Sequence, residues 1–300
     1  MWGVVALLIV SVGLGILARR SRMFPAQTPE VLNSVILNVA LPALVLRVLH
    51  DVPVTPSLFA AASMLWLQFL LSLTVFWLLA RFTSLERGTA GALILTAGLS
   101  NTAYVGLPVI EAVLGHEALG VAVFVDQIGS FLVMASLGIA AAAAFSGRSA
   151  HPRTIALKVL RFPPFIALVV AFLLRPVAFP AWALTTLDRL GGLLTPLALF
   201  SVGFQLRFGE VHRRLGALGA GLLFKLAVSP LVLGLLFALF AAPASTEWKV
   251  TVLQCAMPPM VTGGILASQS ELDPPLAAAM VGVGLPLSAA TLAVIVHLMG

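Results

Sequence analysis

Long apolar stretches separated by short polar breaks run from one end of the chain to the other. A helix that crosses a bilayer needs about 20 mainly apolar residues, and ten stretches approach or exceed this length. They are residues 2–18, 30–49, 57–80, 88–113, 118–145, 154–174, 184–206, 213–240, 248–269 and 274–298. The pattern predicts an all-α polytopic membrane protein with ten transmembrane helices.

The clearest polar break divides the predicted helices into two sets of five. It covers residues 146–154, so the expected domains are residues 1–145, a short cytoplasmic linker at 146–154, and residues 155–300. An odd number of spans in each half makes the second half enter the membrane in the opposite direction. The expected architecture is therefore two inverted five-helix repeats.

Prolines occupy corresponding spans of the two halves. Pro42 in the second stretch has a counterpart in Pro196 of the seventh, and Pro108 in the fourth has counterparts in Pro258 and Pro259 of the ninth. Proline removes a helical hydrogen bond, and freed carbonyls persist in a membrane only where they face protein or water. Paired interruptions of this kind predict broken, crossing helices four and nine around a transporter's binding site. The alternative is that these prolines only kink packed helices.

Composition supports a membrane location. Residues AVILMFWYC make up 60% of the chain, charged residues only 9%, and the mean hydropathy is +1.10; soluble domains carry about 25% charged residues. The net charge of +6 comes from short basic clusters between apolar stretches. This distribution is typical of topology signals and argues against nucleic acid as a partner.

Basic residues set the expected orientation. Ten arginines follow odd-numbered stretches, against four basic residues on the other side, so the first set is predicted to be cytoplasmic. We therefore expect a multi-pass protein of the plasma (inner) membrane with both termini outside. The ten are Arg19, Arg20, Arg22, Arg81, Arg87, Arg148, Arg153, Arg207, Arg213 and Arg214, and the four are Arg47, Arg175, Arg189 and Lys249.

An ionisable residue deep in the membrane is a functional candidate because burying it is costly. Asp126 lies near the middle of the fifth stretch and is followed by Gln127. A buried carboxylate can carry a proton or hold a cation, so both residues are candidates for ion coupling. The alternative is a structural pair between Asp126 and Lys225 of the eighth stretch.

Polar residues also gather at the interrupted stretches. An asparagine amide offers donors and an acceptor, and the N-terminus of a broken helix attracts anions. Each polar residue alone is equally compatible with hydrogen bonding between packed helices. The predicted substrate-binding residues are Asn38, Asn101, Thr102, Tyr104, Pro108, Pro258, Pro259 and Thr262, with Gln254 added to the coupling residues.

The sequence contains no motif of a known catalytic or nucleotide-binding type, so we expect no enzyme and no cofactor beyond possible Na⁺ or H⁺ coupling. The single cysteine, Cys255, excludes an internal disulfide and is expected to be a small buried residue. Glu271 and Asp273 are interpreted as a solvated turn.

Four ordered segments carry a resemblance to a known family. They are LNVALPALV, SNTAYVGLP, TPLALFSVGFQL and MPPMVTGGILA. With these segments the chain resembles the auxin efflux carrier family in its short bacterial form, over essentially its full length. The resemblance implies a homodimer whose helices one, two, six and seven form a scaffold, while helices three to five and eight to ten form a mobile transport domain.

The resemblance also implies the activity, which is secondary transport of small organic anions by an elevator-type movement. The related fold of bile acid:sodium symporters leaves open a sodium-coupled symporter of larger amphipathic anions, with Asp126, Gln127, Asn101 and Gln254 as ligands. A third possibility is a non-transporting membrane sensor or lipid-binding protein. The expected partners are the organic anion, membrane lipids and a second copy of the chain in a homodimer.

Overall fold

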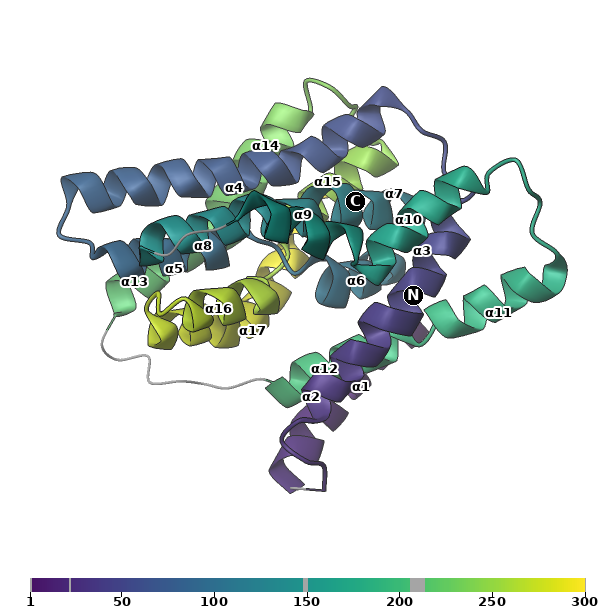
Figure 1. Cartoon of the computed structure of the whole chain (residues 1–300), viewed down its shortest axis with the longest axis horizontal. Helices are drawn as coiled ribbons and strands as arrows, with labels where there is room; N and C mark the ends of the chain where they lie inside the picture. Colours follow the sequence, from purple (N-terminus) through teal and green to yellow (C-terminus); the bar gives the residue numbers. More distant parts are fainter. Residues whose placement is uncertain (1, 22, 148–150, 206–213, 300) are drawn as a thin grey trace.

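The computed structural model describes residues 2–21, 23–147, 151–205 and 214–299 (Figure 1). All regular secondary structure in these residues is helical, so the prediction of an all-α protein is confirmed. One isolated antiparallel β-bridge joins Ser100 and Pro259. Arg22, Arg148, Arg207 and Arg213, and part of the predicted linker at 146–154, lie outside the described residues.

Within the residues that the structure describes, six helical segments are long and apolar enough to cross a membrane. Several of them join α-helices (α) through tight or wide turns (η). They are Thr28–Leu49 (α2 Thr28–Val35, η1 Ile36–Ala40, α3 Leu41–Leu49), α4 Pro56–Phe82, His116–Ser146 (η3 His116–Ala118, α7 Leu119–Phe124, η4 Val125–Phe131, η5 Met134–Gly138, α8 Ile139–Ser146), Ala181–Gln205 (α11 Ala181–Gly191, α12 Leu194–Gln205), Leu215–Phe237 (α13 Leu215–Leu223, η6 Phe224–Val228, α14 Ser229–Phe237) and α17 Pro274–Leu298.

The other predicted stretches are also helical, three of them in two pieces. They are α1 Trp2–Ser21, α5 Arg87–Gly98 with η2 Thr102–Gly106 and α6 Leu107–Leu114, α9 Pro152–Leu160 with α10 Pro163–Leu173, and α15 Thr246–Ala256 with α16 Val261–Gln269. The chain is thus a multi-pass membrane protein, whereas the count of ten spans in two inverted repeats stays a prediction.

Wide π turns explain how three helices accommodate proline. The turns η1, η2 and η6 each end two residues before a proline, which is Pro42, Pro108 and Pro230 respectively. Proline has no N–H and its ring strikes the carbonyl four residues earlier. A π turn contains one extra residue, which moves that carbonyl away from the ring. These helices therefore continue through their prolines.

The helices pack in two groups (Figure 1). In the first group, α1 packs against α12, α12 also contacts α2, and α3 packs against α10 and α11. In the second group, α4 packs against α5 and η4, α14 against α15, and α16 against α5 and α17. Contacts between the groups are fewer and include α3 with α7 and α12 with η2.

Glycines bring α1 and α12 close together. A Cβ atom on Gly15 would lie 2.2 Å from the Phe200 carbonyl oxygen, and one on Gly203 would lie 2.3 Å from the Val12 carbonyl oxygen. Only glycine permits this distance between the two backbones. Gly15 and Gly203 therefore mark the place where the backbones of α1 and α12 touch each other.

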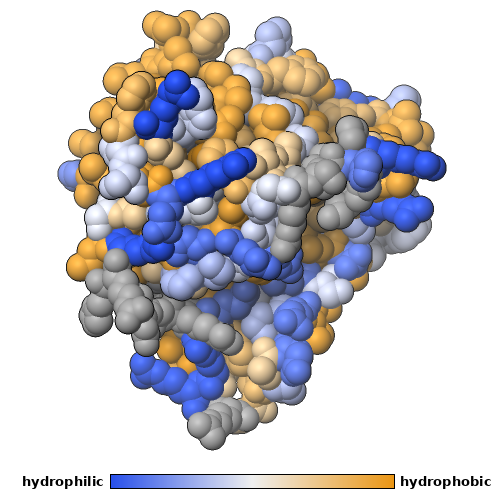
Figure 2. All heavy atoms as spheres, turned by 60° about the vertical axis from the view of Figure 1, so that its left-hand side comes forward, coloured by the Kyte–Doolittle hydropathy of each residue, from blue (hydrophilic) through white to orange (hydrophobic). Residues whose placement is uncertain are grey.

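The surface is largely apolar, as expected for a protein surrounded by lipid. In Figure 2 hydrophobic residues cover the upper part of the face, while hydrophilic residues gather in a band across its middle and lower part. Large side chains such as Phe82, Leu239 and Leu298 are strongly exposed.

Asp273 differs from its prediction as part of a solvated turn. Its side chain is only 5% exposed and pairs with Arg214 Nη1 at 2.9 Å. Asp273 Oδ2 also accepts a hydrogen bond from Thr89 Oγ1 at 2.8 Å, and Asp273 Oδ1 caps α17 by accepting from the Leu276 N–H. The prediction was wrong for Asp273 because the start of α17 packs against α5, which brings these partners to the turn. Glu271 is exposed.

Candidate transport site

Two interrupted helices cross at their unwound segments. The first segment lies between α5 and η2, at residues 99–101, and the second between α15 and α16, at residues 257–260. They run antiparallel, because the Asn101 N–H donates to the Pro258 carbonyl at 2.9 Å and the Met260 N–H donates to the Leu99 carbonyl at 3.0 Å.

The sequence at this crossing suits its geometry. Ser100 and Pro259 face each other between these two hydrogen bonds, at the position of a bridge where neither residue donates. The missing N–H of Pro259 therefore costs the crossing nothing. Pro258 and Pro259 together cannot continue α15, so the segment stays unwound.

In the fourth predicted stretch the helix is interrupted at residues 99–101. Pro108, where the sequence predicts the break, is the second residue of α6 and is buried. The π turn η2 accommodates it within the helix. The unwound segment instead coincides with Ser100 and Asn101, at the start of SNTAYVGLP.

A buried polar network holds the crossing on one side. Lys225 Nζ donates to Ser100 Oγ at 2.6 Å and to the Cys255 carbonyl at 2.8 Å. Ser100 Oγ donates to Gln68 Oε1 at 2.9 Å, and Gln68 Nε2 donates to Ser229 Oγ at 2.8 Å and to the same Cys255 carbonyl at 3.0 Å. All five residues are buried, with Cys255 buried as predicted.

Sequence reasoning did not assign Gln68, Ser100 or Ser229 to the site. The sequence does carry a signal for Gln68, which is an isolated amide in the apolar stretch of α4. A polar side chain at that depth in a membrane requires partners. Lys225 and Asp126 do not bond to each other, because each has other partners. The alternative of a structural pair between these two residues is therefore not supported.

Asp126 forms a second cluster, and its partners come from η2 and η4. Thr102 Oγ1 donates to Asp126 Oδ1 at 2.5 Å and Gln127 Nε2 donates to Asp126 Oδ2 at 2.8 Å. Gln254 Nε2 donates to the Ala122 carbonyl at 3.4 Å. All three predicted coupling residues are buried. They belong to η4 and α15, which are both part of the second helix group.

Several buried polar atoms near the crossing have no hydrogen-bond partner. They are Asn101 Nδ2, Gln127 Oε1, Ser130 Oγ and Gln254 Oε1. Such atoms are rare in folded proteins and call for a ligand, water or ion. Asn101 is only 2% exposed, so its amide is a donor that is withdrawn from bulk solvent.

Asn101 belongs to the lining of two cavities. One, here called the Asp126 cavity, has a volume of about 130 Å³ and is lined by Asp126, Gln127, Tyr104 and Thr262 among others. The other, here called the α12–α16 cavity, has a volume of about 250 Å³ and includes Pro259 and Gln205 in its lining. Asn101 and Val261 line both cavities, and no lysine, arginine or histidine of the described chain lines either one.

The structure thus brings most of the predicted site residues together. Asn101, Pro258 and Pro259 form the crossing, and Thr102, Tyr104 and Thr262 lie beside it. Asn38 lines neither cavity, although Leu37 and Leu41 line the Asp126 cavity. The Asn38 side chain is exposed on η1 and donates to the Ser34 carbonyl at 2.8 Å. Pro108 lines neither cavity.

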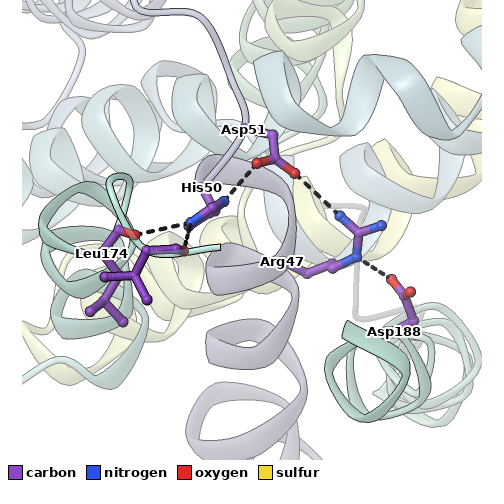
Figure 3. A network of polar contacts seen from close by, with 6 residues as sticks. Arg47, His50, Asp51, Leu174 and Asp188 are labelled. Carbon is purple, nitrogen blue, oxygen red and sulfur yellow. Dashed lines mark hydrogen bonds and ion pairs between the residues drawn. The ribbon is translucent and has the colours of Figure 1, made fainter. Parts of the chain in front are cut away.

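A second polar network lies at the end of α3, away from the crossing (Figure 3). His50 Nδ1 lies 2.6 Å from Asp51 Oδ1, and His50 Nε2 lies 3.0 Å from the carbonyl oxygens of Leu174 and of Val177. Arg47 in turn contacts Asp188 at 2.8 Å. The hydrogen bond to Asp51 raises the pKa of His50, and the two carbonyls also raise it. Burial acts in the opposite direction but does not cancel these effects.

Comparison with known proteins identifies the family. The family model described as "Membrane transport protein" matches residues 2–296. An uncharacterized transporter of Methanothermobacter thermautotrophicus is 30% identical over 95% of this chain and 93% of its own length. An uncharacterized transporter of Methanocaldococcus jannaschii is 24% identical over 90% of this chain and 89% of its own length.

The chain belongs to this membrane transport protein family. It is the auxin efflux carrier family named from the sequence segments above, so that resemblance is confirmed. Both relatives are described as transporters, which is consistent with the expectation of a protein that is not an enzyme. The crossing described above is therefore the candidate site of a transporter.

Proposed function

We propose that this protein is a secondary transporter of small organic anions. The observation that carries the proposal is the buried, unpartnered Nδ2 of Asn101, which lies where two interrupted helices cross and belongs to a residue that lines two cavities. A carboxylate oxygen is the natural acceptor for that amide. Its desolvation is offset only if such a partner is present.

The surroundings of the crossing also favour an anion. The Lys225 ammonium reaches Ser100, the residue next to Asn101. The helix α16 begins at Val261, which lines both cavities, and no side chain caps its first turn. Free N–H groups at a helix N-terminus attract negative charge.

We assign coupling to Asp126, Gln127 and Gln254. Asp126 carries a proton in one version of the mechanism. In the second version, Na⁺ binds the carboxylate with the unpartnered oxygens of Gln127 and Gln254, because hard cations take oxygen ligands. This second version corresponds to a sodium-coupled symporter of the bile acid type.

For the movement, the first helix group serves as scaffold and the second as the mobile transport domain. The sparse contacts between the groups support this division. Alternating access then takes the crossing from one side of the membrane to the other in an elevator-type movement. The protein acts in the plasma (inner) membrane as a homodimer, with both termini outside.

The test is uptake of a panel of radiolabelled carboxylates into proteoliposomes, with Na⁺ and pH gradients imposed separately. Asn101→Ala is expected to weaken substrate affinity by about 1–3 kcal/mol, or about five- to 150-fold. Asn38→Ala is the matched control, because Asn38 is exposed and bonded to its own helix. Equal affinity in wild type and a folded Asn101→Ala protein would remove Asn101 from the site.

A further inference from the structure

The α12–α16 cavity has polar atoms from both helix groups in a mainly apolar lining. Asn101 contributes its amide from the crossing, and Gln205 contributes a second amide from the end of α12. Two further polar residues, Ser268 and Gln269, line the cavity. The Ser268 hydroxyl donates to the Gly264 carbonyl at 2.9 Å, and Gln269 has an interaction of its own. None of the described lining residues carries a charge.

The orientation of the Gln205 amide is fixed by its neighbours. Its Nε2 lies 3.2 Å from the Ser201 carbonyl oxygen and 2.9 Å from Ser201 Oγ. A carbonyl oxygen only accepts, so the nitrogen of the amide must face Ser201. Ser201 Oγ donates in turn to Asn33 Oδ1 at 2.8 Å, which leaves its lone pairs for Gln205.

This arrangement gives the two amides opposite roles. Asn101 Nδ2 is an unpartnered donor, whereas the remaining polar atom of Gln205 is the acceptor Oε1. A ligand that satisfies both amides carries an acceptor at one end and a donor at the other. A second carboxylate at Gln205 would place two acceptors against each other, and none of the described lining residues is positively charged.

We propose that Gln205 determines substrate specificity by accepting a hydrogen bond from a hydroxyl or amino group of the transported carboxylate. The preferred substrate is a carboxylate with an apolar middle and a hydrogen-bond donor at the far end. This inference rests on the proposed function, because it uses Asn101 as the carboxylate contact. A site built to bond a substrate hydroxyl rejects the analogue that lacks it.

The experiment uses probes that differ only at the far end of the chain. Hexanoate, ω-hydroxyhexanoate and hexanedioate, together with the corresponding four-carbon acids, are added to the purified full-length protein. Affinity is measured by ligand-induced thermal stabilisation and by competition for uptake into proteoliposomes. The hydroxy acid is expected to bind at least about tenfold more tightly than the plain acid, a factor that corresponds to about 1.4 kcal/mol, and the diacid more weakly than the hydroxy acid.

Two variants separate specificity from folding. Gln205→Leu and Gln205→Met remove the acceptor with different shapes, and both are expected to bind the plain and the hydroxy acid equally while still binding carboxylates. Gln27→Leu, the same change at an exposed glutamine before α2, is expected to keep the wild-type preference.

The possible outcomes distinguish a failure of the role assigned to Gln205 from a failure of the proposed transport function. A hydroxyl preference that persists in both folded Gln205 variants overturns the role of Gln205 but leaves the transport function standing. Absence of a hydroxyl preference in the wild type also overturns it. Failure of every carboxylate to bind the wild type, or binding that is unaffected by Asn101→Ala, overturns the proposed function itself.

Discussion

His50 is surrounded by acceptors on both ring nitrogens. Asp51 faces Nδ1 and two carbonyls face Nε2, and both nitrogens can donate only when the imidazole is protonated. The charged groups of the neighbouring elements are Arg47 on α3, Arg175 after α10, and Asp188 and Arg189 on α11. The protonated ring therefore joins the end of α3 to the segment after α10.

This geometry predicts a stability that depends on pH. The folded state raises the pKa of His50, so its stabilising effect is present below the unfolded value, about 6.5, and is lost as the pH rises through the higher folded value. We expect wild-type stability to fall by about 1 kcal/mol over this range, the size of one hydrogen bond, and His50→Gln to lack this fall. Thermal unfolding in detergent at several pH values measures it.

His116→Gln is the control for this experiment. The His116 ring is 58% exposed and lies 3.3 Å from Glu111, so this variant is expected to follow the wild-type pH dependence. An identical pH dependence in wild type and His50→Gln would contradict the assignment to His50.

Single residues of the site were predictable from the sequence where a polar group interrupts an apolar stretch. Asn101 and Asp126 were found in this way, because burial of such groups in a membrane demands partners. The partners themselves were not predictable. Lys225 bonds to a backbone carbonyl and to Ser100, and both acceptors become available only because the helices unwind and cross.

At the scale of the helices, the α1–α12 contact provides a test of backbone packing. A methyl group on Gly15 would collide with the backbone of Phe200 and Phe204, which cannot rotate away. Gly15→Ala is therefore expected to destabilise the protein by about 1–3 kcal/mol, as overpacked contacts do.

Gly13 offers a matched control on the same helix. A Cβ atom added there meets nothing within 4 Å, and alanine is the better helix former. Thermal unfolding should thus show a lower midpoint for Gly15→Ala and an unchanged or higher one for Gly13→Ala. Equal midpoints would mean that α1 and α12 are not held together at Gly15.

Helix positions followed from hydropathy, but the location of one of the two interruptions did not. Proline identifies a missing N–H, and the sequence suggested a break at Pro108. The chain instead inserts the π turn η2 before Pro108 and unwinds at Leu99–Asn101. At Pro258 and Pro259 the break does coincide with proline, because two adjacent prolines leave no N–H with which to continue α15.

At the scale of the whole molecule, Asp126 links the crossing to the remainder of the second helix group. Thr102 belongs to η2, directly after the unwound segment, while Asp126 and Gln127 belong to η4. A change in the charge of Asp126 therefore acts on η2, which begins directly after Asn101. In the proposed mechanism this contact joins binding of the coupling ion to binding of the anion.

Asp126→Asn separates charge from shape at this position. The asparagine oxygen can still accept from Thr102, and the Gln127 amide can rotate so that its unpartnered Oε1 accepts from the new Nδ2. The variant is thus expected to fold with wild-type stability, to lose accumulation driven by a proton or sodium gradient, and to retain exchange of labelled for unlabelled substrate. Proteoliposome uptake with each gradient imposed alone measures both activities.

Glu111→Gln makes the same chemical change at a carboxylate that is 32% exposed, and it should keep the gradient response. If Asp126→Asn accumulates substrate with the gradient dependence of the wild type, Asp126 is a structural residue and the coupling ion binds elsewhere.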